Sequence, residues 1–284
     1  MQIGSDEQRK KADALRVLHT GPEPLVLVNV WDSGSARVIE DLGFPAIATT
    51  SAGIAFSNGL PDGEKISPER MMAAVAKIAQ AVNVPVTADA EAGYGDSPES
   101  AAETARNLVT AGAVGMNFED ATRRTEQPLA DLKLQVERIH AIRESSAEMR
   151  VPLVLNARTD VYLLQVGDPP KRYDEAVKRL QAYRDAGADC VFVPGVGDPE
   201  TIRRFVSDLR CPLNILAVAG SPSIPELTVL GVKRISLGSG PMRAALGTLG
   251  RLGQEVRAEG TYSNMSGAPS HAEMNQLMGK KRSN

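Results

Sequence analysis

Residues 84–120, VPVTADAEAGYGDSPESAAETARNLVTAGAVGMNFED, contain the pattern that decides the fold. Short apolar runs at 84–90 and 114–120 have the composition of strands that are buried on both faces. Between them, Ser97 and Pro98 place a helix-capping residue before a proline at the first helical position, and Gly112 stands where a helix would end. The stretch therefore predicts a strand, a helix and a second strand, which is the unit of a parallel sheet.

The same alternation continues in both directions along the chain. Amphipathic segments with helical spacing, such as 68–82 and 171–187, separate further short apolar runs. Eight strands alternating with helices predict a single (β/α)8 barrel of the TIM type. An open, doubly wound sheet is the alternative, but its Gly-rich first turn is missing. The six further runs are 25–31, 46–51, 152–160, 190–195, 212–218 and 234–240.

Most of the 284 residues are expected to form one catalytic domain. Residues 1–24 are predicted to be an N-terminal helix and the segment that leads into the barrel. Residues 25–259 are predicted to be the (β/α)8 barrel itself. Residues 260–284 are predicted to be an extended, helical C-terminal segment that packs on an oligomer partner.

The composition excludes several classes of function. A net charge of −3 and a pI of about 5.8 provide no basic surface for nucleic acid or for an anionic membrane. No apolar run approaches the ~20 residues of a bilayer span, and residues 1–11 are charged, so we expect a cytoplasmic protein without an export signal. Cys190 and Cys211 are too few for a disulfide framework. Three widely spaced histidines disfavour a zinc site or a Ser-His-Asp triad.

Polar side chains gather where three consecutive predicted strands end. Asp89 and Glu91 are two residues apart, so they point the same way along a strand. Glu119 lies at the end of the next strand and Arg158 at the end of the one after it. Because the C-terminal ends of barrel strands form one rim, these carboxylates predict a site for Mg²⁺, with Mn²⁺ as the other suitable ion. The competing interpretation is that they cap helices and pair with arginines.

Two polar stretches beside this rim are predicted to close over a ligand. Residues 52–66 form a longer connection than the roughly two to six residues that are usual between a strand and a helix. Residues 121–128, ATRRTEQP, have the composition of a lid, and a plain solvated loop is the alternative. Backbone N–H groups near Ser51 and Gly53 are candidates to hold a carboxylate or an oxyanion.

Six motifs together resemble those of the isocitrate lyase/phosphoenolpyruvate mutase superfamily. They follow one another on successive predicted strands, from about residue 28 to residue 247. The resemblance implies a TIM barrel enzyme that cleaves or forms a C–C or P–C bond beside a 2-oxo or 2-hydroxy acid, through a metal-bound enolate. The motifs are NVWDSGSA (29–36), TSAG (50–53), LPDG (60–63), ADAEAGYG (88–95), FED (118–120) and NARTD (156–160).

The resemblance also implies a role for each matching residue. Asp89 would contact Mg²⁺ directly, and Glu91 and Glu119 would hold the waters of the metal. Arg158 would pair with the substrate carboxylate and polarise its 2-oxygen, forming the catalytic set with Asp62 and Glu119. A homo-oligomer, either a tetramer that exchanges C-terminal helices or a dimer, is implied in the same way. The other expected substrate contacts are Ser51, Ala52, Gly53 and Asn214.

Departures from the superfamily motifs limit which of its reactions are expected of this chain. The usual Asp-Ala-Asp reads Asp89-Ala90-Glu91 here. Residues 121–128 lack the K-[KR]-C-G-H motif of the isocitrate and methylisocitrate lyases, whose Cys is their general acid, and also lack the asparagine expected of the mutase. Pro194 and Gly195 stand where those lyases carry a glutamate. Isocitrate lyase activity is therefore not expected.

The leading hypothesis is a Mg²⁺-dependent lyase that acts on a small 2-oxo or 2-hydroxy (di)carboxylate, similar to oxaloacetate decarboxylase and dimethylmalate lyase. A P–C bond enzyme, either a phosphonopyruvate hydrolase or a phosphoenolpyruvate mutase, is the alternative. A 2-oxoacid-binding protein without turnover is a third possibility. Residues 219–221 and 238–241 also resemble the phosphate-binding turns of sugar-phosphate barrels, but no lysine ends a strand to form a Schiff base.

Overall fold

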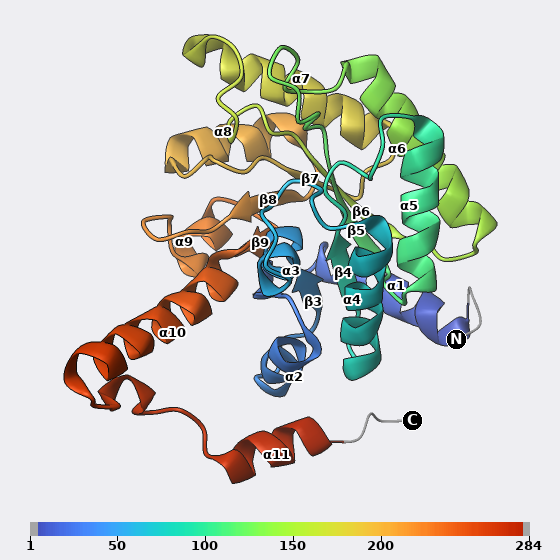
Figure 1. The fold of residues 1–284 in the computed structure, drawn as a ribbon. Coiled ribbons are helices and arrows are strands. Elements are labelled where there is room, and N and C mark those ends of the chain that lie inside the picture. The colour runs from blue at the N-terminus through green and yellow to red at the C-terminus, as the bar shows by residue number, and fades with distance from the viewer. Residues whose placement is uncertain (1–4, 281–284) are drawn as a thin grey trace.

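The computed structural model describes residues 5–280, which form a barrel of parallel strands surrounded by helices (Figure 1). All strand pairs are parallel, in the order β1-β9-β8-β7-β6-β5-β4-β3-β2. The predicted TIM-type α/β barrel is confirmed. The strands are β1 Leu25–Leu27, β2 Asn29–Val30, β3 Ile47–Thr49, β4 Val86–Asp89, β5 Gly115–Glu119, β6 Val154–Arg158, β7 Cys190–Phe192, β8 Leu213–Leu216 and β9 Arg234–Ser236.

Eleven α-helices are found in the described part of the chain. They are α1 Asp6–Leu18, α2 Ser33–Asp41, α3 Ser51–Ser57, α4 Pro68–Ala81, α5 Pro98–Thr110, α6 Leu132–Glu148, α7 Arg172–Asp185, α8 Pro199–Leu209, α9 Ile224–Val229, α10 Gly240–Glu259 and α11 His271–Gly279. Short 3₁₀ turns at Pro169–Lys171 and Ser263–Met265 precede α7 and follow α10.

The first predicted strand, 25–31, is divided in two at Val28. β1 pairs with β9, whereas β2 pairs with β3. The chain changes its neighbour here because it closes the barrel between the first and last strands. Asn29 joins the two sides: its amide nitrogen donates to the Thr49 carbonyl (2.8 Å), and its amide oxygen accepts from the backbone of Leu237 and Gly238 (2.9 Å each).

Local signals in the sequence fixed the helix ends. Ser67, Ser97 and Asp198 cap α4, α5 and α8 with their side chains, and each precedes a proline at the start of its helix. Glycines just past the ends of four helices, the predicted Gly112 among them, have φ of 85°, 96°, 107° and 89°, a region in which glycine has no steric cost. They are Gly43, Gly112, Gly187 and Gly231.

The expectation of a loop over residues 52–66 was wrong in its first half. Residues 51–57 form α3, whose N-terminus is capped by the Thr50 hydroxyl, an acceptor for the Gly53 N–H (3.3 Å). The helix forms because Ile54 and Ala55 are buried against the barrel. The true connection between α3 and α4 is 58–67.

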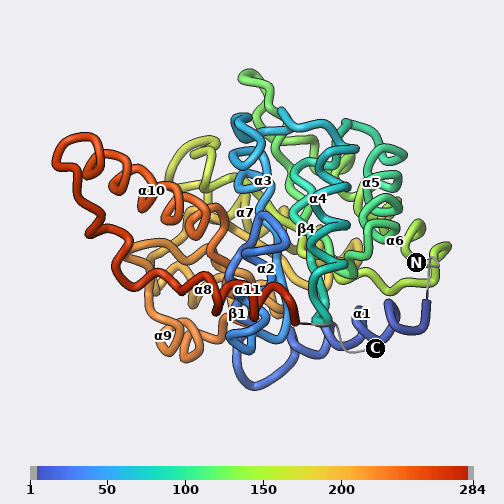
Figure 2. Tube along the Cα trace, turned by 60° about the horizontal axis from the view of Figure 1, so that its bottom comes forward, coloured from blue at the N-terminus to red at the C-terminus, as the bar shows by residue number. Residues whose placement is uncertain are grey.

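One end of the barrel is covered by a helix and the other is open. α1 covers the N-terminal end, where Leu15 lies so close to Gly115 that a Cβ on that glycine would be 2.7 Å from the Leu15 side chain. The C-terminal end is open. α10 leads away from the barrel, and α11 returns to lie beside α2 (Figures 1 and 2). No helix in residues 5–280 is long and apolar enough to cross a membrane.

Candidate active site

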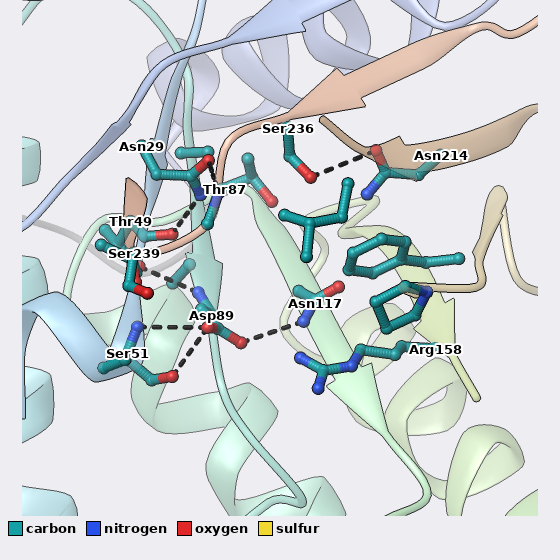
Figure 3. Close-up of a pocket in the computed structure, with 18 of the residues that line it drawn as sticks. Asn29, Thr49, Ser51, Thr87, Asp89, Asn117, Arg158, Asn214, Ser236 and Ser239 are labelled. Carbon is teal, nitrogen blue, oxygen red and sulfur yellow. Dashed lines mark hydrogen bonds between the residues drawn. The ribbon is translucent and has the colours of Figure 1, made fainter. Parts of the chain in front are cut away.

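A cavity of about 360 Å³ opens at the C-terminal ends of the strands. Its wall contains side chains from β2, β3, β4, β5, β6, β7, β8 and β9, and loop residues complete it (Figure 3). This is the end of a barrel at which enzymes of this architecture carry their chemistry. Six of the residues predicted as functional line it: Ser51, Ala52, Asp62, Asp89, Arg158 and Asn214.

Asp89, the last residue of β4, is held on the cavity wall by three donors (Figure 3). One carboxylate oxygen accepts from the Ser51 amide (3.1 Å) and hydroxyl (2.7 Å), and the other accepts from the Asn117 amide (2.9 Å). A carboxylate has about four lone-pair positions, so these bonds leave about one for a ligand. The carboxylate is thus oriented by α3 and β5 before any ligand binds.

Glu91 is buried beside Asp89 but does not line the cavity. The prediction that Asp89 and Glu91 point the same way assumed that the strand continues to Glu91. The strand ends at Asp89, and Glu91 has a left-handed backbone with φ of 49°, so the side-chain alternation of a strand does not apply to it. One carboxylate oxygen accepts from the Glu64 N–H (2.6 Å) and from Arg123 (2.9 Å), and the other is buried without a partner. Burial, with the charge of Asp89, raises the pKa of Glu91 to about 7.

Glu119, the last residue of β5, is also buried behind the cavity wall. One of its oxygens accepts from Arg123 (2.7 Å) and the other from Arg158 (2.8 Å). Burial raises its pKa to about 8 although Arg158 opposes the shift. Glu91 and Glu119 are therefore two carboxylates whose ionised forms depend on nearby cations.

Arg123 supplies one of those cations and was not predicted from the sequence. It belongs to the 121–128 loop, and its guanidinium joins Glu91 to Glu119. The sequence showed two adjacent arginines in a polar loop, and nothing distinguished Arg123 from Arg124, which instead pairs with the exposed Asp96.

Arg158 has a fixed orientation in the cavity wall. Asp160 accepts from its Nε (2.6 Å) and from Nη2 (3.0 Å) in a bidentate ion pair, while Glu119 accepts from Nη1. The Asp160 amide in turn donates to the buried Asp120 (2.9 Å). Asp120 and Asp160 are thus positioning residues, and the sequence-based set of site residues omitted both.

Gly53 lies outside the lining, unlike its neighbours Ser51 and Ala52. Its N–H donates to Thr50, and a Cβ at this position would lie 2.5 Å from the Thr50 methyl group. The glycine is therefore required for the close approach of α3 to the barrel.

Of the two turns that resemble phosphate-binding segments, Gly238 and Ser239 line the cavity where α10 begins.

The carboxylates near the cavity have the chemistry of a hard-cation site. Asp89 and Asp62 line it, and Glu91 and Glu119 lie behind it. Among the residues that the structure describes, no His or Cys joins the lining to offer the nitrogen or sulfur ligand that softer metals select. Within residues 5–280, no three Asp, Glu, His or Cys side chains converge as direct ligands. The buried, unpartnered oxygen of Glu91 and the raised pKa values of both glutamates are consistent with a cluster that a cation would stabilise.

The family profile described as phosphoenolpyruvate phosphomutase matches residues 15–257. The chain belongs to this family. It is 38% identical over 230 residues to an uncharacterized protein of Mycobacterium tuberculosis, with 81% of this chain and 83% of the other covered. The predicted membership of the isocitrate lyase/phosphoenolpyruvate mutase superfamily is confirmed.

Solved structures of the superfamily share the whole fold. A candidate lyase/mutase from Burkholderia cenocepacia is 40% identical, with a TM-score of 0.92 and with 98% of this chain and 99% of that chain covered. 2,3-Dimethylmalate lyase, a superfamily member, is 29% identical, with a TM-score of 0.83 and 95% of each chain covered.

More distant relatives of this family member differ in their reactions. An oxaloacetate decarboxylase of Rhodopseudomonas palustris is 28% identical, with 91% of this chain and 89% of the other covered. A phosphonopyruvate hydrolase solved with oxalate and Mg²⁺ is 26% identical, with a TM-score of 0.83 and 95% of each chain covered. The named enzymes among the relatives are thus a decarboxylase, a lyase and a hydrolase.

Proposed function

We propose that this protein is a Mg²⁺-dependent lyase that cleaves a C–C bond of a small 2-oxo or 2-hydroxy (di)carboxylate through an enolate. The observation that carries the proposal is one cavity wall on which Asp89, held by three donors, and the oriented guanidinium of Arg158 occur together. A cation bound at Asp89 and the Arg158 charge would both stabilise negative charge developing on a 2-oxygen. The names of the oxaloacetate decarboxylase and dimethylmalate lyase relatives support the same class.

In this proposal Asp89 is the direct ligand of Mg²⁺, and Glu91, Glu119 and Asp62 act through its waters. Mg²⁺ usually keeps several waters and prefers carboxylate oxygens, which suits a set in which Asp89 and Asp62 line the cavity and the two glutamates lie behind its wall. When bound, the ion supplies Lewis-acid stabilisation of a substrate oxygen. Mn²⁺ has the same ligand preference and would substitute.

Three groups of this chain would orient the substrate. Arg158 would hold its carboxylate and 2-oxygen, and its pairing with Asp160 and Glu119 fixes the plane in which it does so. The amides of Ser51 and Gly53 already donate to Asp89 and Thr50, so we assign the substrate carboxylate to the Ala52 amide. Asn214 would contact the far part of the substrate.

The test is a metal-dependent assay on the full chain with oxaloacetate and with phosphonopyruvate. We expect pyruvate release from oxaloacetate that requires Mg²⁺ and stops with chelator, after subtraction of the reaction catalysed by Mg²⁺ alone. Phosphate release from phosphonopyruvate without oxaloacetate turnover would replace the proposal with the P–C alternative. Binding of oxalate and Mg²⁺ without turnover of either compound would indicate a 2-oxoacid-binding protein.

We also propose that the chain forms a homo-oligomer, a tetramer or a dimer, through α10. This helix is exposed over most of its length, with Leu246, Leu249 and Val256 between 44% and 62% accessible. Three interior glycines, Gly247, Gly250 and Gly253, each cost a helix about 1 kcal/mol relative to alanine. These leucine, valine and glycine residues form the exposed stripe of α10. A second copy packed closely against this stripe would offset that cost and cover the apolar side chains.

A further inference from the structure

Arg234 is a charged side chain at the foot of the cavity that the proposed reaction does not use. It begins β9, is 2% exposed, and lines the cavity. Other buried or half-buried arginines of residues 5–280 have clear partners: Arg158 and Arg179 pair with carboxylates, and Arg138 donates to three oxygen atoms. Arg234 has no carboxylate within ion-pair distance in the described structure.

Within residues 5–280, the side chain of Arg234 contacts the His19 ring and has no ion-pair partner. Its Nη1 lies 3.2 Å from His19 Nε2. Nδ1 of the same ring lies 2.8 Å from the Leu15 carbonyl and therefore carries the proton, so Nε2 accepts from Arg234 and the ring is neutral. Burial, together with Arg234, lowers the pKa of His19 to about 4, which keeps it neutral. A buried guanidinium without a counterion is costly unless an anion reaches it.

Two further polar groups of the cavity lack hydrogen-bond partners in the described part of the chain. The Asn214 amide nitrogen and the Thr87 hydroxyl are buried without a hydrogen-bond partner, as is the Arg234 Nε. All three residues line the same cavity, and Figure 3 shows Asn214 and Thr87 on its wall, with Asn214 held from behind by Ser236 (3.3 Å). Each of these orphaned groups can donate a hydrogen bond, and an anionic group has the lone pairs to accept such bonds.

One row of strand-register partners runs from Arg158 at the rim to Arg234. Arg158, Phe192, Asn214 and Arg234 are successive register partners across β6, β7, β8 and β9, and all four line the cavity. Arg158 is the last residue of its strand and Arg234 the first of its own. Because barrel strands are tilted, this row leads from the C-terminal rim towards the N-terminal end. The cavity therefore has a guanidinium at each end of one row.

We infer that Arg234, with Asn214 and Thr87, forms a second anion subsite at the foot of the cavity that holds one carboxylate-sized anionic group. The planar fork of an arginine matches a carboxylate, and the neighbouring donors complete its coordination. The group is carried either by the far end of the substrate, in which case the inference rests on the proposed function, or by a free small anion.

The test compares 2-oxo acids of equal length that differ at the far end. 2-Oxovalerate and 2-oxoglutarate, and 2-oxohexanoate and 2-oxoadipate, are titrated calorimetrically into the Mg²⁺-loaded full chain. Wild type is expected to prefer at least one diacid over its monoacid by ~10- to 100-fold, as charge-assisted hydrogen bonds provide. Arg234→Met should remove the preference and leave the affinity for the monoacid unchanged. Arg234→Lys, which keeps the charge without the fork, should retain only part of it.

A second arm detects a free anion. Crystals of the wild type soaked in bromide should show an anomalous peak at Arg234 that is absent in Arg234→Met, and bromide should raise the melting temperature of the wild type alone. A bromide site at Arg234 supports the anion subsite even if no 2-oxo acid binds to the protein. A failure of all 2-oxo acids to bind would count against the proposed function and not against the subsite. The inference is overturned if Arg234→Met leaves every diacid preference unchanged and bromide finds no site at Arg234.

Melting temperatures separate a subsite from a structural role. Without ligand, Arg234→Met should melt at or above the wild-type temperature, since it removes an uncompensated buried charge. A much lower melting temperature together with unchanged ligand preferences would show that Arg234 serves the fold through His19, and would overturn the inference. If the methionine variant does not fold, the lysine variant and the bromide soak on wild type decide.

Discussion

At the scale of single residues, Asp89 allows the sharpest test of the metal site. Asp89→Asn removes the charge that would bind Mg²⁺, and the rate should fall at least about a hundredfold because Lewis-acid stabilisation provides several kcal/mol. The asparagine also turns a donor towards Ser51 or Asn117, so the metal-free variant should lose about 1 kcal/mol of stability. The decisive measurement is the rise in melting temperature on adding Mg²⁺, which the variant should lack.

Asp96→Asn is the matched control for that experiment. Asp96 lies on the same connection but is exposed and pairs with Arg124 outside the cavity. It should keep the Mg²⁺ response of the wild type. An Asp89→Asn protein with the full Mg²⁺ response would refute the assignment of Asp89 as a metal ligand.

Arg158→Lys is expected to be a damaging change although it keeps the charge. Lysine cannot reproduce the two-pronged bond to Asp160 or present a planar fork to a substrate. We expect kcat to fall ~10- to 100-fold, because the contact should strengthen as negative charge develops on the substrate. Steady-state kinetics check this, and an unchanged kcat with a raised KM would mean that Arg158 contributes uniform binding only.

The sequence identified cavity-lining residues where the strand pattern was regular. Asp89, Arg158 and Asn214 lie within strands, so their inward direction follows from the two-residue period. Glu91 lies past the strand end, where a left-handed backbone breaks the period. Arg123 and Arg234 were missed for different reasons: a loop has no period, and an inward arginine at a strand start looks like any surface arginine in the sequence.

At the scale of elements, the connection 58–67 and the loop 121–128 form one unit over the rim. Arg123 binds Glu91 and Glu119, the Glu64 amide also binds Glu91, and a Cβ on Gly63 would lie 3.6 Å from the Arg123 guanidinium. We predict that glutamyl endopeptidase cuts these loops, at Glu64 and Glu126, more slowly when Mg²⁺ and oxalate are present.

Arg123→Gln should accelerate cleavage at both loops, because it removes the contact that joins them to the rim. Arg124→Gln, a change at the adjacent arginine, is the control and should cut at the wild-type rate. Equal cleavage with and without Mg²⁺ and oxalate would argue against closure of the loops over a ligand.

The contact between α1 and β9 predicts an acid-dependent loss of stability. His19 has an ordinary pKa of 6.5 and a folded pKa lowered to about 4 by burial and Arg234. Between these values the unfolded chain binds more protons than the folded chain, so stability falls as the pH drops from about 6.5 to about 4, by roughly 3 kcal/mol for this group.

His19→Gln isolates this contribution, since glutamine can donate to Leu15 and accept from Arg234 without titrating. The free energy of unfolding of wild type and variant, measured in urea at neutral pH and near pH 5, should converge or cross as the pH falls. A difference between the two proteins that does not change with pH would contradict the proposed titration.

At the scale of the whole molecule, the barrel was predictable because it repeats. Each strand and helix carries its own signal, and eight repetitions of one pattern determine the closed sheet even though the first strand is divided at Val28. The path of α10 was not predictable in this way. Nothing in the apolar pattern of residues 240–259 indicates a helix that leaves the barrel, and its direction comes from tertiary contacts beyond it.

Those contacts return the chain to its own barrel. Glu255 accepts from Thr261, from the backbone of Ser263 and from Asn264, which holds the turn at the far end of α10. At the C-terminal end of α11, the Lys280 carbonyl accepts from Arg37, and its ammonium pairs with Asp41 of α2. α10 is therefore held as an arm with both ends fixed and its apolar side chains exposed.

Such an arm is expected to be covered by another copy of the chain. Leu249→Glu places a charge in the middle of the exposed stripe, where Leu249 is 62% accessible, and should lower the mass measured by light scattering towards the 30.2 kDa of one chain. Val229→Glu, at a position that is 88% exposed at the end of α9, is the control and should leave the mass unchanged. If the oligomer supports the fold, Leu249→Glu should also melt at a lower temperature that depends on protein concentration. A wild type with the mass of a single chain would mean that the glycines and leucines of α10 are exposed in solution, and the proposed oligomer would be wrong.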